Sequence, residues 1–174
     1  RWRGLESELL ADAPTYLYGA PAVAARLIAA PLTTVAAEPL LGSPTYWEGW
    51  FREGGLAIRA SPIATFNDAS LMLQAAELGL GITVASAVLA ADAEFEGRLV
   101  RLSERPVPAA LIRPHPRASS QYHLAWPPAL RDWAPLVTLR QWLRDEMTAT
   151  LGRRLPAPVA TGRGSPRRGR RSAG

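Results

Sequence analysis

The segment that most constrains the fold is residues 63–84, whose residue order predicts a short strand, a capped helix and a second strand. Asn67 or Asp68 can cap the helix by accepting a bond from a backbone N–H two or three residues later. Gly79 stands where helices commonly end in a left-handed turn, and Ile82-Thr83-Val84 is typical of a buried strand. The start of such a helix presents unpaired N–H groups that favour an anion, so this segment indicates a binding site.

Strand and helix patterns alternate along the rest of the chain, which favours an α/β sandwich with mostly parallel strands. The expected strands are residues 15–18, 39–41, 99–102 and 121–126, and the expected helices are 22–30, 44–53, 87–96 and 134–151.

Four of the helices carry apolar residues at helical spacing, and we expect these residues to face the core. They are Leu71, Met72, Ala75 and Leu78; Val88, Leu89, Ala91 and Phe95, partly buried; and Leu136, Leu139, Leu143 and Met147. The aromatic group is Trp47, Trp50 and Phe51, and it could instead face a dimer partner.

Composition narrows the class of protein. The chain has 174 residues, 48% of them apolar, and no apolar run of about 20 residues that would predict a transmembrane helix. A signal-peptide pattern is not seen either, and the start at Arg1 without Met suggests a fragment. The absence of cysteine excludes disulfides and thiolate chemistry, and it is compatible with the cytoplasm.

The net charge of +5 is concentrated at the C-terminal end. Residues 152–174 contain seven Arg and no acidic residue, which leaves 13 Arg against 15 acidic residues in the rest. We expect this Arg-rich tail to be disordered, and we favour a solubilising end over an arm that binds nucleic acid through phosphates.

Residue patterns for catalysis or metal binding are not found. His115 lies between prolines and His123 lies in an expected strand, and neither has an acidic partner at a ligand spacing. Glu6 and Glu8 share one face of a probable strand, for which a solvated face is favoured over a catalytic pair. We therefore expect no enzyme activity, no metal and no cofactor.

The order of several short segments resembles the effector-binding domain of LysR-type transcriptional regulators, in particular the glycine-cleavage-activator-like subgroup. Each segment is a weak signal, but together they follow the family's order over residues 2–147. The segments include Trp2-Arg3-Gly4-Leu5, Tyr16 to Pro21, Pro39-Leu40-Leu41, Trp47 to Leu56, Phe66 to Ser70, Ala75 to Ile82, Gly97 to Leu102 and Tyr122 to Pro127.

This resemblance implies an α/β fold like that of type 2 periplasmic binding proteins, with one complete subdomain and part of a second. The partial first subdomain, with the crossing strands, would comprise residues 1–15 and 103–151, and residues 16–102 would form the second. A small anionic or zwitterionic effector would bind in the cleft between them. The implied contacts are Phe66, Asn67, Asp68, Ala69, Ser70 and Thr83, although capping alone also accounts for Asn67, Asp68 and Ser70.

The resemblance also implies a cytoplasmic homodimer or tetramer with no membrane contact. DNA would be bound only through a winged helix-turn-helix domain, which this sequence does not contain. Two alternatives remain open from the sequence. One is a solute-binding protein of the same fold, and the other is a non-functional truncated fragment with an exposed half-sheet.

Overall fold

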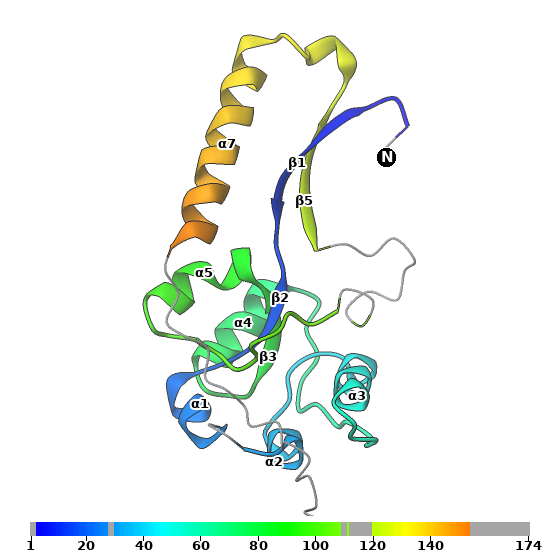
Figure 1. Ribbon diagram of the computed structural model, residues 1–174, viewed down its shortest axis with the longest axis vertical. Coiled ribbons are helices and arrows are strands. Elements are labelled where there is room, and N and C mark those ends of the chain that lie inside the picture. Colours follow the sequence, from blue (N-terminus) through cyan, green and yellow to red (C-terminus); the bar gives the residue numbers. More distant parts are fainter. Residues whose placement is uncertain (1–2, 28–29, 109–110, 112–119, 154–174) are drawn as a thin grey trace, which may run out of the picture.

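The computed structural model describes residues 3–27, 30–108, 111 and 120–153, and its elements form an elongated molecule with two parts (Figure 1). One part is a two-stranded sheet beside the longest helix, and the other is a small sheet with helices on both faces. The first part consists of β1 (Glu6–Asp12), β5 (Gln121–Trp126), the 3-10 helix η1 (Pro128–Leu130) and α7 (Ala134–Gly152). The second consists of β2 (Thr15–Gly19), α1 (Pro21–Leu27), α2 (Leu32–Ala37), α3 (Pro44–Glu53), α4 (Ala69–Glu77), β3 (Thr83–Ser86), α5 (Ala87–Phe95) and β4 (Val100–Arg101).

The sheet of the second part has the order β3-β2-β4, and both ladders are antiparallel. Among the described residues, parallel pairing occurs only at two bridges, Leu40 with Ile82 and Leu41 with Ala64, which extend the sheet beyond β3. The expectation of mostly parallel strands is therefore wrong for the named strands. β2 follows β1 along the chain and runs antiparallel to β3 and β4. The alternation of helices and strands in the sequence does not reveal this direction.

Side chains alternate across this sheet and divide the core into two layers. Leu17 and Ile82 belong to the layer packed by α1, α2 and α3, whereas Tyr18 and Ala85 belong to the layer packed by α4 and α5. The prediction for α3 is confirmed for Trp47 and Phe51, which are fully buried and stacked on each other. The indole of Trp47 also donates to the carbonyl of Leu41 at 3.0 Å, which ties α3 to the sheet.

The predicted faces of α4 and α5 are wrong in part. α4 buries Leu73, Ala75 and Ala76, while Leu71 and Leu78 are exposed. In α5 the expected Phe95 is exposed, and a face rich in alanine is buried instead. Both helices carry apolar residues around most of their circumference, so periodicity alone does not select a face. In α5 the buried face consists mostly of alanines, whose small side chains let the helix approach the sheet closely.

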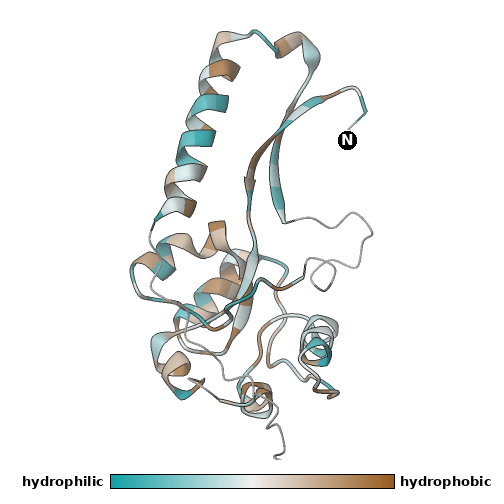
Figure 2. Ribbon diagram, viewed as in Figure 1, coloured by the Kyte–Doolittle hydropathy of each residue, from teal (hydrophilic) through white to brown (hydrophobic). Residues whose placement is uncertain are grey.

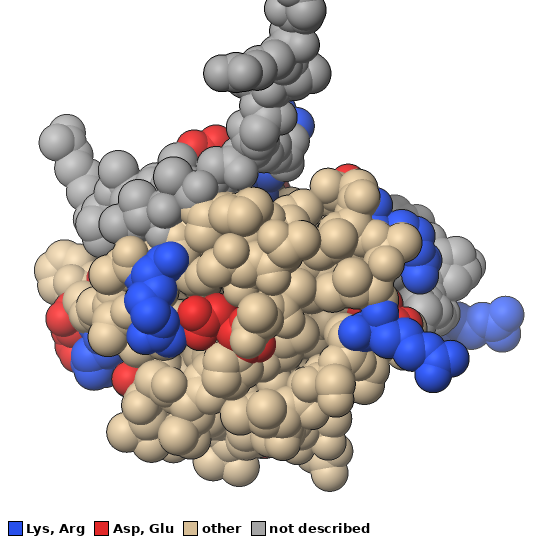
Figure 3. Space-filling model, turned by 90° about the horizontal axis from the view of Figure 1, so that it is seen from below, with Lys and Arg blue, Asp and Glu red and all other residues tan. Residues whose placement is uncertain are grey.

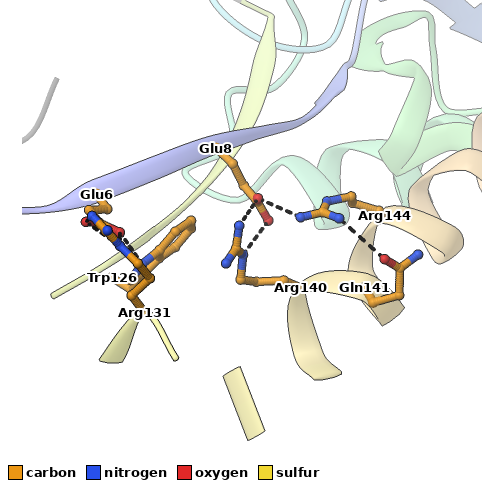
Figure 4. Close-up of polar contacts among 7 residues, drawn as sticks. All are labelled: Glu6, Glu8, Trp126, Arg131, Arg140, Gln141 and Arg144. Carbon is orange, nitrogen blue, oxygen red and sulfur yellow. Dashed lines mark hydrogen bonds and ion pairs between the residues drawn. The ribbon is translucent and has the colours of Figure 1, made fainter. Parts of the chain in front are cut away.

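Ion pairs hold α7 against β1 (Figure 4). Glu8 accepts bonds from Arg140 and Arg144, and Glu6 pairs with Arg131 and accepts a bond from the indole of Trp126. The solvated strand face expected for Glu6 and Glu8 is therefore wrong, because charged residues far along the chain pack over it. α7 contains intermixed apolar and polar turns (Figure 2), and only Leu136 of its expected apolar stripe is buried, while Leu139 is exposed.

Two residues of the tail expected at 152–174 are described. Gly152 ends α7, and Arg153 forms an ion pair with Asp92 at 2.6 Å. The remainder lies outside the described residues, as does His115. Among the helices that are described, none combines the length and the apolar character needed to cross a membrane.

Candidate functional site

Three helices begin at the same edge of the second part's sheet. Because Leu40 pairs in parallel with Ile82 and Leu41 with Ala64, the chain leaves these strands in one direction. α3 begins just after the strand at Leu41, α4 follows the one at Ala64, and α5 follows β3 directly. Ligands of open α/β sheets bind outside such carboxyl ends. We refer to this edge, formed by the starts of α3, α4 and α5, as the helix-start edge.

Asp68 determines the electrostatics at the start of α4. One of its carboxylate oxygens, Oδ1, accepts bonds from the backbone N–H of Ser70 at 2.7 Å and of Leu71 at 3.1 Å. These bonds, that of Leu71 first, lower the pKa of the Asp68 carboxyl, so it is ionised at neutral pH. The carboxylate therefore occupies the place that sequence analysis assigned to an anionic ligand, and it presents a negative charge to solvent.

The structure brings together most of the residues expected to contact a ligand. Asn67, Asp68, Ala69 and Ser70 are exposed at the helix-start edge. Phe66 precedes them and is partly buried against the core layer under α4 and α5. This cluster combines an acidic group, an amide, a hydroxyl and an apolar ring within five consecutive residues.

Thr83, unlike this cluster, is buried. It is the first residue of β3, is fully buried, and lies opposite Tyr18 on the neighbouring strand. Its hydroxyl has no hydrogen-bond partner among the described residues. Thr83 is thus buried while Asn67 to Ser70 are exposed, and among the described residues no hydrogen bond joins its hydroxyl to them.

Ser86 and Tyr122 are two polar residues at this edge that sequence analysis did not connect. The Ser86 hydroxyl accepts a bond from the N–H of Leu89 at 3.3 Å, which confirms the predicted cap. It also lies 3.5 Å from the Tyr122 hydroxyl, which belongs to β5 in the other part of the molecule. This contact bridges the two parts where they meet, and the sequence gives no local signal for a pair 36 residues apart.

A second polar cluster lies inside the layer under α5. Glu94 is 1% exposed and accepts bonds from Tyr18 at 3.2 Å and Arg101 at 3.1 Å. Arg101 also lies over the ring of Tyr16, and burial raises the pKa of the Tyr18 hydroxyl. This cluster ties β2, β4 and α5 together. Across the described part of the chain, no group of three His, Asp or Glu side chains is arranged to hold a metal ion.

Comparison with known proteins gives the family. A sequence model described as the LysR substrate binding domain matches residues 1–148. The search of curated proteins finds no match.

Solved structures give the fold. The effector domain of AmpR of Pseudomonas aeruginosa is 23% identical, with a TM-score of 0.63 over 87% of this chain and 70% of that one. The AmpR effector-binding domain from Citrobacter freundii is 19% identical, with a TM-score of 0.63 over 86% of this chain and 70% of that one. The CrgA regulatory domain from Neisseria meningitidis is 19% identical, with a TM-score of 0.58 over 83% and 70% of the two chains.

The mixed α/β architecture is thus that of effector-binding domains with the type 2 periplasmic-binding-protein-like fold, as the resemblance implied. The chain belongs to the LysR substrate-binding domain family.

Proposed function

We propose that this chain is the effector-binding and dimerisation portion of a LysR-type DNA-binding transcriptional regulator that senses a small metabolite. Family membership over residues 1–148 supports the class of protein. We assign residues 1–15 and 103–151 to the partial first subdomain and residues 16–102 to the second. The assignment to the glycine-cleavage-activator-like subgroup rests only on the sequence segments quoted above. We propose that the domain senses a ligand rather than catalysing a reaction, in keeping with its membership of the LysR substrate-binding domain family.

The observation that carries the proposal is the exposed start of α4 at the helix-start edge. The start is accessible, since Asn67 to Ser70 are all exposed. It lies on the edge where Ser86 meets Tyr122 of β5, and so faces the other part of the molecule. A ligand there would touch both parts, and its binding would change their relative position and shift an equilibrium in the oligomer.

The charge of Asp68 favours a zwitterionic ligand over a purely anionic one. Its ionised, exposed carboxylate suits an ammonium group, whereas a bare anion would be repelled. The Ser70 hydroxyl and the Asn67 amide would bind the ligand's carboxylate, with the dipole of the α5 start behind Ser86. Phe66 and Ala69 would supply apolar contact. A ligand contact at Thr83 stays a prediction, because this residue is fully buried and a ligand would have to enter the core of the second part to reach its hydroxyl.

Charge on the described surface fits this division of roles. On the end of the molecule opposite β1 and β5, seen in Figure 3, basic and acidic side chains lie intermixed. The described residues on this face form no continuous basic patch of the kind that binds nucleic acid. We propose that DNA is bound by a separate helix-turn-helix domain of the same regulator, in the cytoplasm.

The test is a calorimetric titration of the chain with the standard α-amino acids and with the carboxylic acids that lack the amino group. We expect one or a few amino acids to bind and the matched acids to bind more weakly. Asp68→Asn keeps the oxygen that caps α4 but removes the charge, so it should lower the melting temperature only slightly and weaken binding about tenfold or more.

Asp68→Ala serves as the comparison, since it removes both the cap and the charge. Equal binding by wild type and Asp68→Asn would refute the role of the charge. Cooperative melting without binding of any amino acid or acid would refute the proposed site, and loss of cooperative melting in the wild type would favour the truncated-fragment alternative.

A further inference from the structure

The buried ion pair under α5 makes only one of the two bonds that its geometry allows. Arg101 Nη2 donates to Glu94 Oε2 at 3.1 Å, and the Tyr18 hydroxyl donates to the same oxygen at 3.2 Å. The other carboxylate oxygen, Glu94 Oε1, and the Nε of Arg101 are buried and have no hydrogen-bond partner among the described residues. Each of these two atoms is joined through a single carbon to an atom of the 3.1 Å contact, so both belong to one ion pair.

The pair of Glu8 and Arg140 shows the complete geometry in the same molecule (Figure 4). There, Nε and Nη2 of the guanidinium donate to the two oxygens of the carboxylate, at 3.1 and 2.7 Å. The pair under α5 has the Nη2 bond and lacks the Nε bond. It is also the more buried of the two pairs, because Glu94 is 1% and Arg101 13% exposed, against 18% for Glu8 and 23% for Arg140.

The unpartnered atoms carry a cost that is larger in the interior than at the surface. A buried charged pair is stable only where its remaining lone pairs and N–H groups are bonded as well. Native interiors satisfy nearly all such groups, either with protein atoms or with ordered water. Glu94 Oε1 and Arg101 Nε therefore call for a partner.

Other contacts oppose a direct bond between these two atoms. The Tyr18 hydroxyl holds the Glu94 carboxylate from the middle strand of the sheet. The Arg101 guanidinium is held over the ring of Tyr16, with Cζ 4.0 Å from the ring centre. Turning either group to close the second bond would give up one of these contacts, so a bridging molecule fits the arrangement better.

The chemistry of the two atoms selects that molecule. Arg101 Nε–H is a donor and Glu94 Oε1 is an acceptor, so the bridge must accept one bond and donate the other. An anion has no proton to donate to a carboxylate, and a metal or ammonium cation cannot accept from an N–H group. The charges of the pair already cancel, so either ion would leave a net charge buried. Water is neutral, small and able to form both bonds.

We propose that one water molecule is held between Glu94 Oε1 and Arg101 Nε, where it completes the contact that joins α5 to β4. Internal waters of this kind bridge buried polar groups and are part of the folded structure. With Tyr18, the bridged pair fixes the last turn of α5 to β2 and β4. The inference does not rest on the proposed ligand, because the helix-start edge involves different residues.

The wild-type full chain offers the first test, since it contains both kinds of ion pair. In protein labelled with 15N-arginine, the Arg101 Nε–H should show a cross-relaxation peak to water with the sign of a long-lived internal water. The Arg140 Nε–H donates directly to Glu8 and is the internal control, for which we expect no such peak. Arg101→Lys and Arg140→Lys assign the two signals. No peak at Arg101, or an equal peak at both residues, would overturn the proposal.

A high-resolution crystal structure of the full chain gives the second test. We expect a water within roughly 2.7–3.2 Å of both Glu94 Oε1 and Arg101 Nε. A direct bond between these two atoms, or a protein group bonded to them, would overturn the proposal.

Counting long-lived waters by 17O relaxation dispersion gives the third test. The double variant Glu94→Leu with Arg101→Leu removes both bonding atoms, so it should hold one long-lived water fewer than the wild type. Glu8→Leu with Arg140→Leu is the matched control and should lose none, because that pair is bonded directly. Cooperative melting shows that each variant is folded. An unchanged count in the first variant, or an equal loss in both, would contradict the proposed water site.

Discussion

Arg140 of α7 and Glu8 of β1 form a two-point contact, in which Nε and Nη2 of the guanidinium donate to the two carboxylate oxygens at 3.1 and 2.7 Å. Both side chains are more than half buried, and Arg140 also lies over the ring of Trp126. The planar guanidinium matches the carboxylate in two places, which fixes orientation as well as distance. This pair therefore sets how α7 lies along the two-stranded sheet.

Glu8→Gln should lower the free energy of unfolding at neutral pH by about 1–2 kcal/mol, because it weakens the charge-assisted bonds from Arg140 and Arg144. Urea denaturation monitored by tryptophan fluorescence measures this loss. Ser7→Gln is the matched control, since Ser7 is the exposed neighbour on the opposite face of β1. An equal loss in both variants would show that strand propensity, and not the ion pair, is responsible.

The same pair predicts a pH dependence with a defined sign. The hydrogen bond from Arg140, with a smaller one from Arg144, holds the pKa of the Glu8 carboxyl below its ordinary value in the folded state. Its stabilising contribution is therefore present above the unfolded pKa and is lost as the pH falls through the folded pKa. The stability gap between wild type and Glu8→Gln should close in acid. A gap of constant size between neutral pH and acid would contradict this assignment.

Gly81 is predicted to tolerate no side chain. A Cβ at this position would collide with the carbonyl oxygen of Pro39 and lie 3.1 Å from Leu41 Cγ. That carbonyl accepts the N–H of Ile82 at 2.9 Å, so the clash would open the parallel bridge that aligns the helix-start edge. We expect Gly81→Ala to cost about 1–3 kcal/mol in thermal or urea unfolding. Gly152→Ala, where a Cβ meets nothing within 4 Å, should be close to neutral.

The buried pair of Glu94 and Arg101 should behave differently when it is broken and when it is replaced. Glu94→Leu leaves the Arg101 guanidinium, 13% exposed, without its carboxylate, and should cost about 3–5 kcal/mol. The double variant Glu94→Leu with Arg101→Leu removes both charges and should be more stable than the single variant. A double-mutant cycle from urea unfolding measures the coupling, and purely additive losses would refute it.

Local features of the site were predictable from the sequence because they depend on neighbours in the chain. Asp68 caps α4, Ser86 caps α5, and Gly79 adopts a left-handed φ of 76° at the end of α4. Each is a bond or a backbone conformation set within three or four residues. Of the two cap candidates, the structure selects Asp68, whose carboxylate reaches two N–H groups.

Features set by tertiary packing could not be predicted in this way. Glu8 looks solvated until Arg140, 132 residues later, folds over it. Likewise, Leu71 and Leu73 are equally apolar, and only the position of the sheet decides that Leu73 is buried. The antiparallel entry of β2 and the approach of Tyr122 to Ser86 also arise from the path of the chain between the two parts.

The contact between Ser86 and Tyr122 gives the last prediction. At 3.5 Å the two hydroxyls form a weak bond, so the Tyr122 hydroxyl loses little when it turns toward a ligand at the helix-start edge. Tyr122→Phe keeps the ring, which is exposed, and should leave the melting temperature unchanged. Amino-acid affinity, measured by calorimetry, should fall about threefold to tenfold, the value of one neutral hydrogen bond. Tyr16→Phe, on β2, is the matched control, and this variant should bind the amino acid with wild-type affinity. If Tyr122→Phe also binds with wild-type affinity, the ligand makes no bond to this hydroxyl, and β5 does not contribute to the site through it.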